Sequence, residues 1–218
     1  MKESGKKRDK FSLETIKRLG LYLRNLKKLK AQDIDIISSD KLTQLLNVAP
    51  TQFRKDLSCF GGFGKRGVGY NVERLIEEIE NILGVNKEWK IIIVGAGRLG
   101  SALLGYDGFS KFNIKIAYAF DVSEKKAGKH RKGIKIYNLK HIKEVIKNNN
   151  IKIAIITTPA EAAQDIADKL TSTGIKGILN FTPIILQVPK DVLVSNVDMA
   201  CELESLIFFA KQRYIGDE

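Results

Sequence analysis

The segment at residues 94–103 carries residue types that could bind a nucleotide. It contains the spacing G-x-G-x-x-G in the run Gly95-Ala96-Gly97-Arg98-Leu99-Gly100. In this pattern the first glycine makes a tight turn, the second lets the backbone approach a pyrophosphate, and the third lets a helix pack closely on a strand. Backbone N–H groups at the start of the helix then hold the phosphates.

Asp121 stands 21 positions after Gly100. A carboxylate at this distance can accept hydrogen bonds from both hydroxyls of an adenosine ribose. It would repel the additional phosphate of NADP, so the pattern favours NAD(H) as the cofactor. Adenosylmethionine-dependent enzymes also combine a glycine-rich loop with a carboxylate after the second strand, and the glycines could instead serve packing alone.

The sequence around these residues predicts the elements that must position them. Residues 89–94 are largely apolar and β-branched, which is typical of a buried parallel strand. A second strand, at 114–120, ends at Asp121. The alternation continues with a strand at 152–157, a helix at 160–173 and strands at 177–181 and 192–197. This order predicts an α/β fold, a Rossmann-like doubly wound parallel sheet.

Two polar segments follow strands of this predicted sheet. Thr157-Thr158-Pro159-Ala160 and Asn180-Phe181-Thr182-Pro183 both stand at carboxyl ends of strands. Open α/β sheets bind ligands at that edge, so both segments are candidate pocket residues. The alternative is that they form ordinary turns between strand and loop.

The first third of the chain predicts a winged helix-turn-helix. Apolar residues recur with a helical period over residues 13–29, and a short helix follows Ser38. After a turn at 47–49, Pro50 begins a third helix that buries Phe53 and Leu57. Two short helices joined by a three-residue turn are typical of DNA-binding helix-turn-helix motifs. The other face of the third helix presents Thr51, Gln52, Arg54, Lys55 and Ser58, which we expect to contact DNA. An ordinary solvated helix face is the alternative for Arg54 and Lys55.

A glycine-rich run follows this helix. Residues 60–70 contain five glycines, interleaved with aromatic residues and the pair Lys65-Arg66. Glycines permit the positive φ angles of a hairpin. The run therefore predicts a wing whose tip, Lys65 and Arg66, reaches phosphates or a narrow minor groove. A phosphate-binding loop is the alternative, but the run lacks the G-x-x-x-x-G-K-[ST] order and follows a helix rather than a strand.

The distribution of charge supports a nucleic-acid partner for the first third. The chain has 218 residues and a net charge of +12. Residues 1–70 carry 16 Lys/Arg and 7 Asp/Glu, a net charge of +9, whereas residues 71–218 carry 21 and 18, a net charge of +3. A basic N-terminal DNA-binding domain followed by a nearly neutral second domain explains this asymmetry. A merely solvated basic tail is the alternative.

We expect three parts: a winged-helix domain at 1–84, a nucleotide-binding domain at 85–197 and a C-terminal helix at 198–218. A helix at 72–83, capped by Asn71 and ended by Gly84, closes the first part. The C-terminal helix is apolar on several sides, so it must pack against something. It could cover its own sheet or insert between two subunits, because DNA recognition favours a twofold dimer.

Composition excludes several classes of protein. No apolar run is long enough to span a membrane, and the start MKESGKKRDK lacks the apolar region of a secretory signal. The two cysteines, Cys59 and Cys201, suit a reducing cytoplasm and lack metal-ligand spacing, so we expect no metal. A dehydrogenase would need a general acid or base, but His130 and His141 stand in lysine-rich polar surroundings. The chain also lacks the catalytic motif of a methyltransferase. We therefore expect no catalytic residues and no enzyme activity.

The combination of motifs resembles the Rex family of bacterial redox-sensing transcriptional repressors. The resemblance covers about residues 15–214. The segments that carry it are TQFRKDLSCFG at 51–61, FGKRGVGYNV at 63–72, VGAGRLG at 94–100, AFDV at 119–122 and GIKGILNFTP at 174–183. It implies a homodimer that binds a palindromic double-stranded DNA operator and senses the NADH/NAD⁺ ratio, with NADH reorienting the dimer and releasing it from the operator.

The resemblance also implies roles for single residues. Thr158, Pro159 and Ala160 match the segment that lines the nucleotide site. Tyr106 matches a tyrosine near the nucleotide, and Asp198 matches the aspartate that begins a swapped C-terminal helix; together they imply a switch between subunits. The chain departs from many members at Cys59, where tyrosine is common, and at Met199, where the family varies. We expect a buried structural thiol at Cys59, with thiol sensitivity as the alternative.

Overall fold

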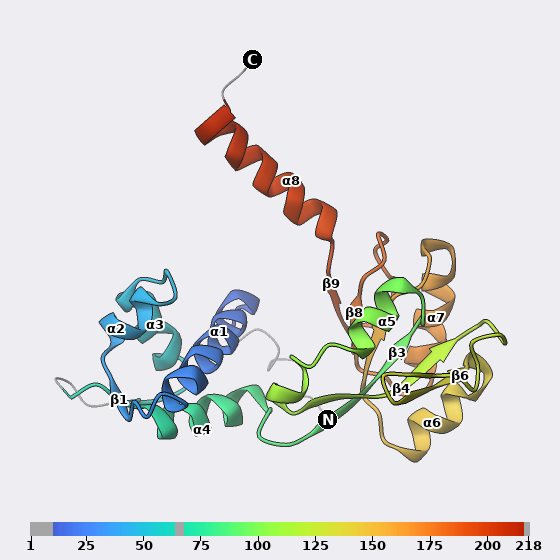
Figure 1. Ribbon diagram of the computed structural model, residues 1–218, viewed down its shortest axis with the longest axis horizontal. Coiled ribbons are helices and arrows are strands. Elements are labelled where there is room, and N and C mark those ends of the chain that lie inside the picture. The colour runs from blue at the N-terminus through green and yellow to red at the C-terminus, as the bar shows by residue number, and fades with distance from the viewer. Residues whose placement is uncertain (1–10, 64–67, 216–218) are drawn as a thin grey trace, which may run out of the picture. The chain divides into compact units, whose positions relative to one another are not determined.

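The computed structural model describes residues 11–63 and 68–215. The chain forms two compact units that divide between Glu88 and Trp89. Both are of the predicted classes: helices with a two-stranded ribbon in the first, and a mainly parallel sheet with helices in the second (Figure 1).

The N-terminal unit contains the predicted helices within one or two residues of their expected bounds. Its elements are α1 (Leu13–Lys30), β1 (Ile36–Ile37), α2 (Ser39–Gln44), α3 (Pro50–Ser58), β2 (Tyr70–Asn71) and α4 (Val72–Leu83). The Ser38 side chain accepts from Lys41 N and caps α2, and the Asn71 side chain accepts from Arg74 N and caps α4. Gly84 ends α4 with a φ of 69°, a left-handed conformation that suits glycine.

The core of this unit forms where α1 packs along α4 and contacts α3. Tyr22 of α1 is fully buried and meets Phe53 of α3 edge to face, with ring centroids 4.9 Å apart. Phe53 and Leu57 are buried, as predicted. Leu13, the first residue of the expected apolar stripe, is exposed because it stands in the first turn of α1.

A short antiparallel ribbon of β1 and β2 forms the base of the predicted wing. Ile36 pairs with Asn71, and Ile37 with Tyr70. Gly69 enters the ribbon at a φ of 92°, and a Cβ there would lie 2.8 Å from the Ile37 carbonyl oxygen. Only glycine allows the two strands to approach this closely without strain.

The second unit is built on a sheet in the spatial order β5-β6-β4-β3-β7-β8-β9. The strands are β3 (Trp89–Val94), β4 (Ile114–Asp121), β5 (His130–Arg131), β6 (Ile134–Asn138), β7 (Ile153–Ile156), β8 (Gly177–Asn180) and β9 (Leu193–Asn196). All neighbours are parallel except β5 and β6. Without β5, the order in chain sequence is 3-2-1-4-5-6, that of a Rossmann fold, with its switch point between β3 and β7.

Helices cover both faces of this sheet. Ile92 and Val94 pack with residues of α6 (Ile142–Asn148) and α7 (Ala160–Ser172), whereas Ile91 and Ile93 pack with Leu104 of α5 (Arg98–Leu104). Because alternate residues of β3 are buried on opposite faces, the strand is a continuous apolar run. Short 3₁₀ turns at Ser110–Phe112 and Leu139–His141 complete the unit.

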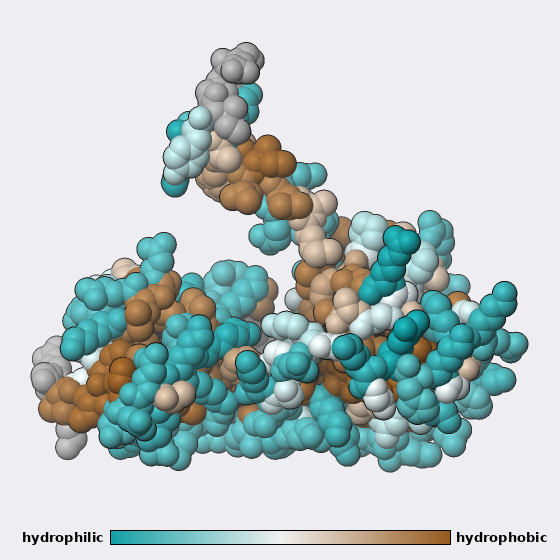
Figure 2. Space-filling view, viewed as in Figure 1, coloured by the Kyte–Doolittle hydropathy of each residue, from teal (hydrophilic) through white to brown (hydrophobic). Residues whose placement is uncertain are grey.

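The last helix, α8 (Met199–Ala210), continues into a π-helical turn at Lys211–Ile215. The structure buries none of the residues of α8. Figure 2 shows hydrophobic side chains gathered along it, and Leu206 is 63% exposed. Exposed large apolar side chains on this helix are Met199, Leu203, Leu206, Ile207, Phe208 and Phe209. A surface of this composition is typical of an interaction site.

Candidate DNA-binding and nucleotide-binding sites

Helix α3 presents a polar face to solvent at the predicted DNA-binding positions. Thr51, Arg54, Lys55 and Ser58 are exposed, and Gln52 is half-buried. The Ser58 hydroxyl donates to the Lys55 carbonyl oxygen at 2.7 Å, so it is turned toward its own helix. The contact of these residues with DNA stays a prediction.

Arg54 is anchored to the neighbouring helix of the motif. Its Nη1 donates to Ser39 Oγ at 2.8 Å, a contact that ties α3 to the first turn of α2. Burial raises the pKa of the nearby Tyr70 hydroxyl, and the positive charge of Arg54 opposes that rise. Ser39 was not a predicted partner of Arg54, because the two residues meet only once the helices have packed.

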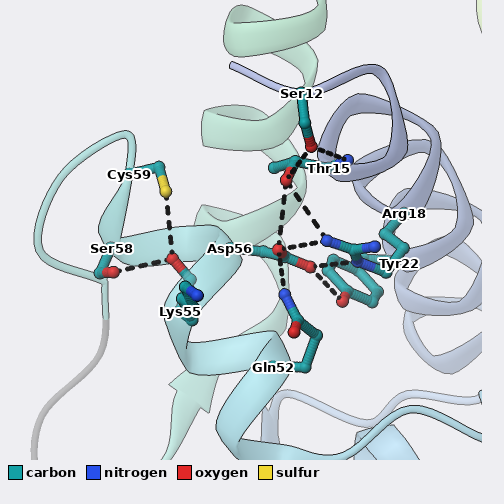
Figure 3. A network of polar contacts seen from close by, with 9 residues as sticks. All are labelled: Ser12, Thr15, Arg18, Tyr22, Gln52, Lys55, Asp56, Ser58 and Cys59. Atoms are coloured by element: carbon teal, nitrogen blue, oxygen red, sulfur yellow. Dashed lines mark hydrogen bonds and ion pairs between the residues drawn. The ribbon is translucent and has the colours of Figure 1, made fainter. Parts of the chain in front are cut away.

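Asp56 is the centre of a buried polar network on the inner side of α3 (Figure 3). Arg18 donates to both carboxylate oxygens, from Nε at 2.6 Å and from Nη2 at 2.7 Å. Tyr22 OH donates at 2.7 Å and Gln52 Nε2 at 2.8 Å. Burial opposes ionisation of Asp56, but these hydrogen bonds outweigh it and hold the pKa below its ordinary value. The carboxylate is therefore ionised and joins α1 to α3.

The wing is described at its base only. Lys65 and Arg66 lie outside the described residues, so their assignment to the wing tip stays a prediction. Phe60 stacks on Phe11 with ring centroids 4.2 Å apart.

The expectation of a buried thiol at Cys59 is wrong: the side chain is exposed just past the end of α3, and Sγ donates to the Lys55 carbonyl oxygen at 3.3 Å.

The glycine loop lies at the switch point of the sheet, between the ends of β3 and β7. Gly95 has a φ of 105°, and a Cβ there would lie 2.6 Å from the Thr157 carbonyl oxygen. A Cβ on Gly100 would lie 1.8 Å from the Gly95 carbonyl oxygen. The Thr157 hydroxyl donates to that same oxygen at 2.8 Å. Both glycines are thus required for the packing of helix α5 against the strand ends.

Gly97 differs from its two neighbours in the pattern. It precedes the first residue of α5, and a Cβ built on it meets no atom within 4 Å. Arg98 is exposed and Leu99 half-buried, while Ala96 is buried against the sheet. The first N–H groups of a helix have no partner within it. Open space beside these groups fits a phosphate that approaches the backbone at Gly97.

Asp121 lies at the end of β4, beside the loop, and is 6% exposed. Its carboxylate accepts from Ala96 N at 2.9 Å, from Ser123 N at 2.9 Å and from Lys126 Nζ at 2.8 Å. Burial would raise its pKa, but these donors together hold the pKa below its ordinary value. Asp121 therefore tethers the glycine loop as well as offering an acceptor to a ribose.

Lys126 is a site residue that sequence reasoning missed. Several lysines follow β4, and nothing in their order distinguishes the one whose ammonium reaches Asp121. A ribose hydroxyl that binds Asp121 must share the carboxylate with this ammonium or displace it.

The segment after β7 supplies a polar atom that lacks a partner. Thr158 Oγ1 is buried and makes no hydrogen bond with the described part of the chain. Pro159 is exposed at the N-cap of α7, and Ala160 is the first residue of that helix. An unsatisfied buried hydroxyl is costly, and Thr158 directly follows Thr157, which contacts the glycine loop, so a polar ligand at this strand end fits it. Together with the open backbone at Gly97 and the carboxylate of Asp121, it fits a dinucleotide.

The segment after β8 forms a turn that satisfies its own polar groups. Asn180 Oδ1 accepts from Thr182 N at 3.0 Å and from Thr182 Oγ1 at 2.7 Å. Asn180 Nδ2 donates to the Ile184 carbonyl oxygen at 2.9 Å. The structure thus favours the turn alternative for these two side chains over a role in a pocket.

Tyr106 and Asp198, the predicted switch residues, are both exposed. Tyr106 packs edge to face on Phe109 at a centroid distance of 5.0 Å. Asp198 caps α8 by accepting from Ala200 N at 3.0 Å and Cys201 N at 3.2 Å. Their role between subunits stays a prediction.

The described ranges, 11–63 and 68–215, contain no group of three or more His, Cys, Asp or Glu side chains that could hold a metal ion. No helix in these ranges is sufficiently long and apolar to cross a membrane. His130 and His141 are both exposed.

The fold and these sites define a class of protein, namely a winged helix-turn-helix unit followed by a Rossmann-like nucleotide-binding unit. Family models agree: residues 10–58 match the model described as "Putative DNA-binding protein N-terminus", and residues 86–184 match that of the CoA binding domain. The chain is 44% identical over 203 residues to the redox-sensing transcriptional repressor Rex of Brevibacillus brevis, covering 93% of this chain and 98% of that protein. It is also 44% identical to Rex of Syntrophobacter fumaroxidans, covering 91% and 95%.

Solved structures agree over both units. The crystal structure of RSP in complex with β-NAD⁺ and operator DNA matches with a TM-score of 0.88 and 36% identity over 94% of each chain. The structure of RSP, a Rex-family repressor, with β-NADH matches with a TM-score of 0.83 and 35% identity over 94% of this chain and 96% of that one. The chain belongs to the Rex family of redox-sensing transcriptional repressors.

Proposed function

We propose that this chain is a cytoplasmic, DNA-binding transcriptional repressor that senses the NADH/NAD⁺ ratio and is not an enzyme. The observation that carries the proposal is the match to RSP in complex with β-NAD⁺ and operator DNA, which extends over 94% of both chains. A likeness confined to one unit would support either DNA binding or nucleotide binding, but not their combination.

In this proposal the nucleotide-binding residues are those at the switch point of the sheet. Gly95 to Gly100 hold the pyrophosphate, and Asp121 accepts from the adenosine ribose. Thr158 supports the assignment because its buried hydroxyl lacks a partner in the described chain. Pro159, Ala160 and Tyr106 complete the proposed site. The bound nicotinamide supplies the redox state that the protein reads, and the protein itself transfers no hydride.

The DNA-binding residues in this proposal are Thr51, Gln52, Arg54, Lys55 and Ser58 of α3, with Lys65 and Arg66 of the wing. Two recognition helices of a homodimer would lie about 34 Å apart, in successive major grooves of a palindromic operator. Phosphate contacts from both wings would make affinity fall steeply with salt concentration.

NADH and operator DNA are coupled by linkage in this proposal. If each ligand favours a different arrangement of the two subunits, each weakens binding of the other by the same factor. NADH then releases the repressor from DNA, whereas NAD⁺ permits binding. Tyr106 and Asp198 are proposed to carry this switch between the subunits.

Fluorescence anisotropy on a palindromic promoter duplex tests the proposal. The protein–DNA complex is titrated separately with NADH, NAD⁺ and NADPH. Release by NADH at micromolar concentrations, unmatched by NAD⁺, is the expected result. DNA binding that is indifferent to all three nucleotides would exclude the sensor function while leaving the winged helix in place.

A further inference from the structure

The buried carboxylate of Asp56 contacts a residue on the proposed DNA-binding face. Gln52 stands one helical turn before Asp56 on α3, and its Nε2 donates to Asp56 Oδ1 at 2.8 Å. Asp56 is 1% exposed, whereas Gln52 is half-buried. Gln52 is thus in contact with both the inner network and the outer face of the helix.

The surroundings of Asp56 determine which amide atom of Gln52 faces inward. An ionised carboxylate can only accept, so the amide atom directed at it must be the nitrogen. The carboxylate itself cannot rotate freely, because Arg18 donates to both of its oxygens and Tyr22 donates to Oδ2. Both partners lie on α1, outside the helix that meets DNA in the proposed function.

After this contact the Gln52 amide still has one N–H donor and one carbonyl acceptor available for a ligand. A glutamine side chain has two N–H donors and one carbonyl acceptor. With one N–H bound to Asp56, the second N–H and Oε1 remain for a ligand. A donor beside an acceptor matches the N7 acceptor and N6 donor of adenine in the major groove.

We propose that Gln52 reads an adenine in each operator half-site and that Asp56 is the positioning residue that holds its amide ready to do so. This inference rests on the proposed function, since it needs α3 to enter the major groove. It gives the Arg18–Tyr22–Asp56 network a role in base specificity in addition to its role in holding α3 on α1.

The test measures the base preferences of full-length variants by selecting the duplexes that each variant binds from a randomised DNA library. Gln52→Ala removes the amide proposed to contact adenine. Asp56→Asn keeps the size of the side chain but removes the charge that orients the amide. Glu80→Gln is the matched control, because Glu80 also pairs with α1, through Lys27 Nζ at 2.6 Å, but from α4 rather than α3. Nucleotide affinity and thermal unfolding are measured for each variant.

We expect the wild-type protein to require adenine at one position of each half-site. Gln52→Ala and Asp56→Asn should both reduce discrimination at that position by roughly fivefold or more, the lower end for one bidentate contact. Glu80→Gln should retain the preference even if it destabilises the protein. Unaltered preferences in Gln52→Ala would overturn the inference. An absence of specific DNA binding by the wild-type protein would instead refute the proposed function.

A second measurement requires only wild-type protein and Gln52→Ala, so it does not depend on the folding of Asp56→Asn. The side-chain amide of Gln52 is assigned in a ¹⁵N–¹H NMR spectrum by its loss in Gln52→Ala. We expect one of its two protons to exchange with water more slowly than those of the exposed Gln44. Exchange as fast as that of Gln44 would refute an amide held by Asp56.

Discussion

Replacing Gly97 or Gly100 by alanine should separate two roles of the same loop. A Cβ on Gly97 meets no atom within 4 Å, and its φ of −77° suits any residue. A Cβ on Gly100 lies 1.8 Å from the Gly95 carbonyl oxygen, far below the 3.0 Å that real contacts respect. One alanine therefore fills open space, and the other collides with the backbone.

The collision at Gly100 sets the size of the stability effect. The helix and the turn must separate by more than 1 Å to reach an allowed contact. Overpacking of this kind costs about 1–3 kcal/mol, which lowers the melting temperature by roughly 2–12 °C for a chain of this size. Gly97→Ala should change the free energy of unfolding by less than about 1 kcal/mol.

Nucleotide binding should respond to Gly97→Ala. The added methyl group occupies the space through which the backbone approaches the pyrophosphate. Loss of one hydrogen bond to a charged group costs about 1.5–3 kcal/mol, which raises the Kd for NADH by about 10- to 140-fold. Gly100→Ala should also weaken binding, because the loop shifts.

Calorimetric titration with NADH and thermal unfolding without nucleotide measure the two effects. Gly62→Ala is the control for loss of a glycine, since a Cβ there also meets no atom within 4 Å and Gly62 belongs to the other unit. Wild-type NADH affinity in Gly97→Ala would refute the proposed pyrophosphate contact. A wild-type melting temperature in Gly100→Ala would refute the packing argument.

Four further substitutions test other contacts. Asp121→Asn should weaken the binding of NADH at least tenfold, while the affinity for operator DNA without nucleotide stays unchanged. An unchanged NADH affinity in calorimetry would remove Asp121 from the site. Arg54→Ala should abolish specific operator binding in anisotropy with normal NADH affinity, and normal operator affinity would contradict the recognition-helix assignment. The pKa of Asp56 is lower folded than unfolded, so its contribution is present above about pH 4 and is lost as pH falls through the folded pKa. Asp56→Asn should therefore cost about 3 kcal/mol at pH 7 in thermal unfolding and progressively less as the pH is lowered from about 4 through the folded pKa, and a cost that does not fall with pH would refute this. Leu206→Glu on the exposed face of α8 should shift the mass in sedimentation from dimer toward monomer, and an unchanged mass would exclude this face from the subunit interface.

Features that depend on neighbours in sequence were predicted well. The caps at Ser38 and Asn71 and the left-handed Gly84 follow from local hydrogen bonding and from the absence of a Cβ. The Rossmann-like class of the second unit followed from alternating apolar strands and helices, and the comparisons confirm the fold, although β6 and α6 were not among the predicted elements.

Features that depend on distant residues were not predicted. Arg18 and Asp56 are 38 positions apart, and no local pattern distinguishes this pair from the many other charges of the first unit. The only local signal was an acidic residue beside Leu57 on the buried side of a helix. In the same way, Lys126 differs from its neighbouring lysines only through the path of the chain after β4. Cys59 was misassigned because the helix ends one residue before it, which turns the thiol to solvent.

The position of α8 in the chain has a consequence for synthesis. This apolar helix follows the strands of the second unit in chain order, so it leaves the ribosome after the N-terminal unit and that sheet have emerged. Domains generally fold as units during translation, from the N-terminus onward. The helix therefore becomes available after the N-terminal unit has had time to fold. In the proposed homodimer its apolar side chains stay exposed until a partner protomer arrives, so slow production of the chain would lengthen that exposure.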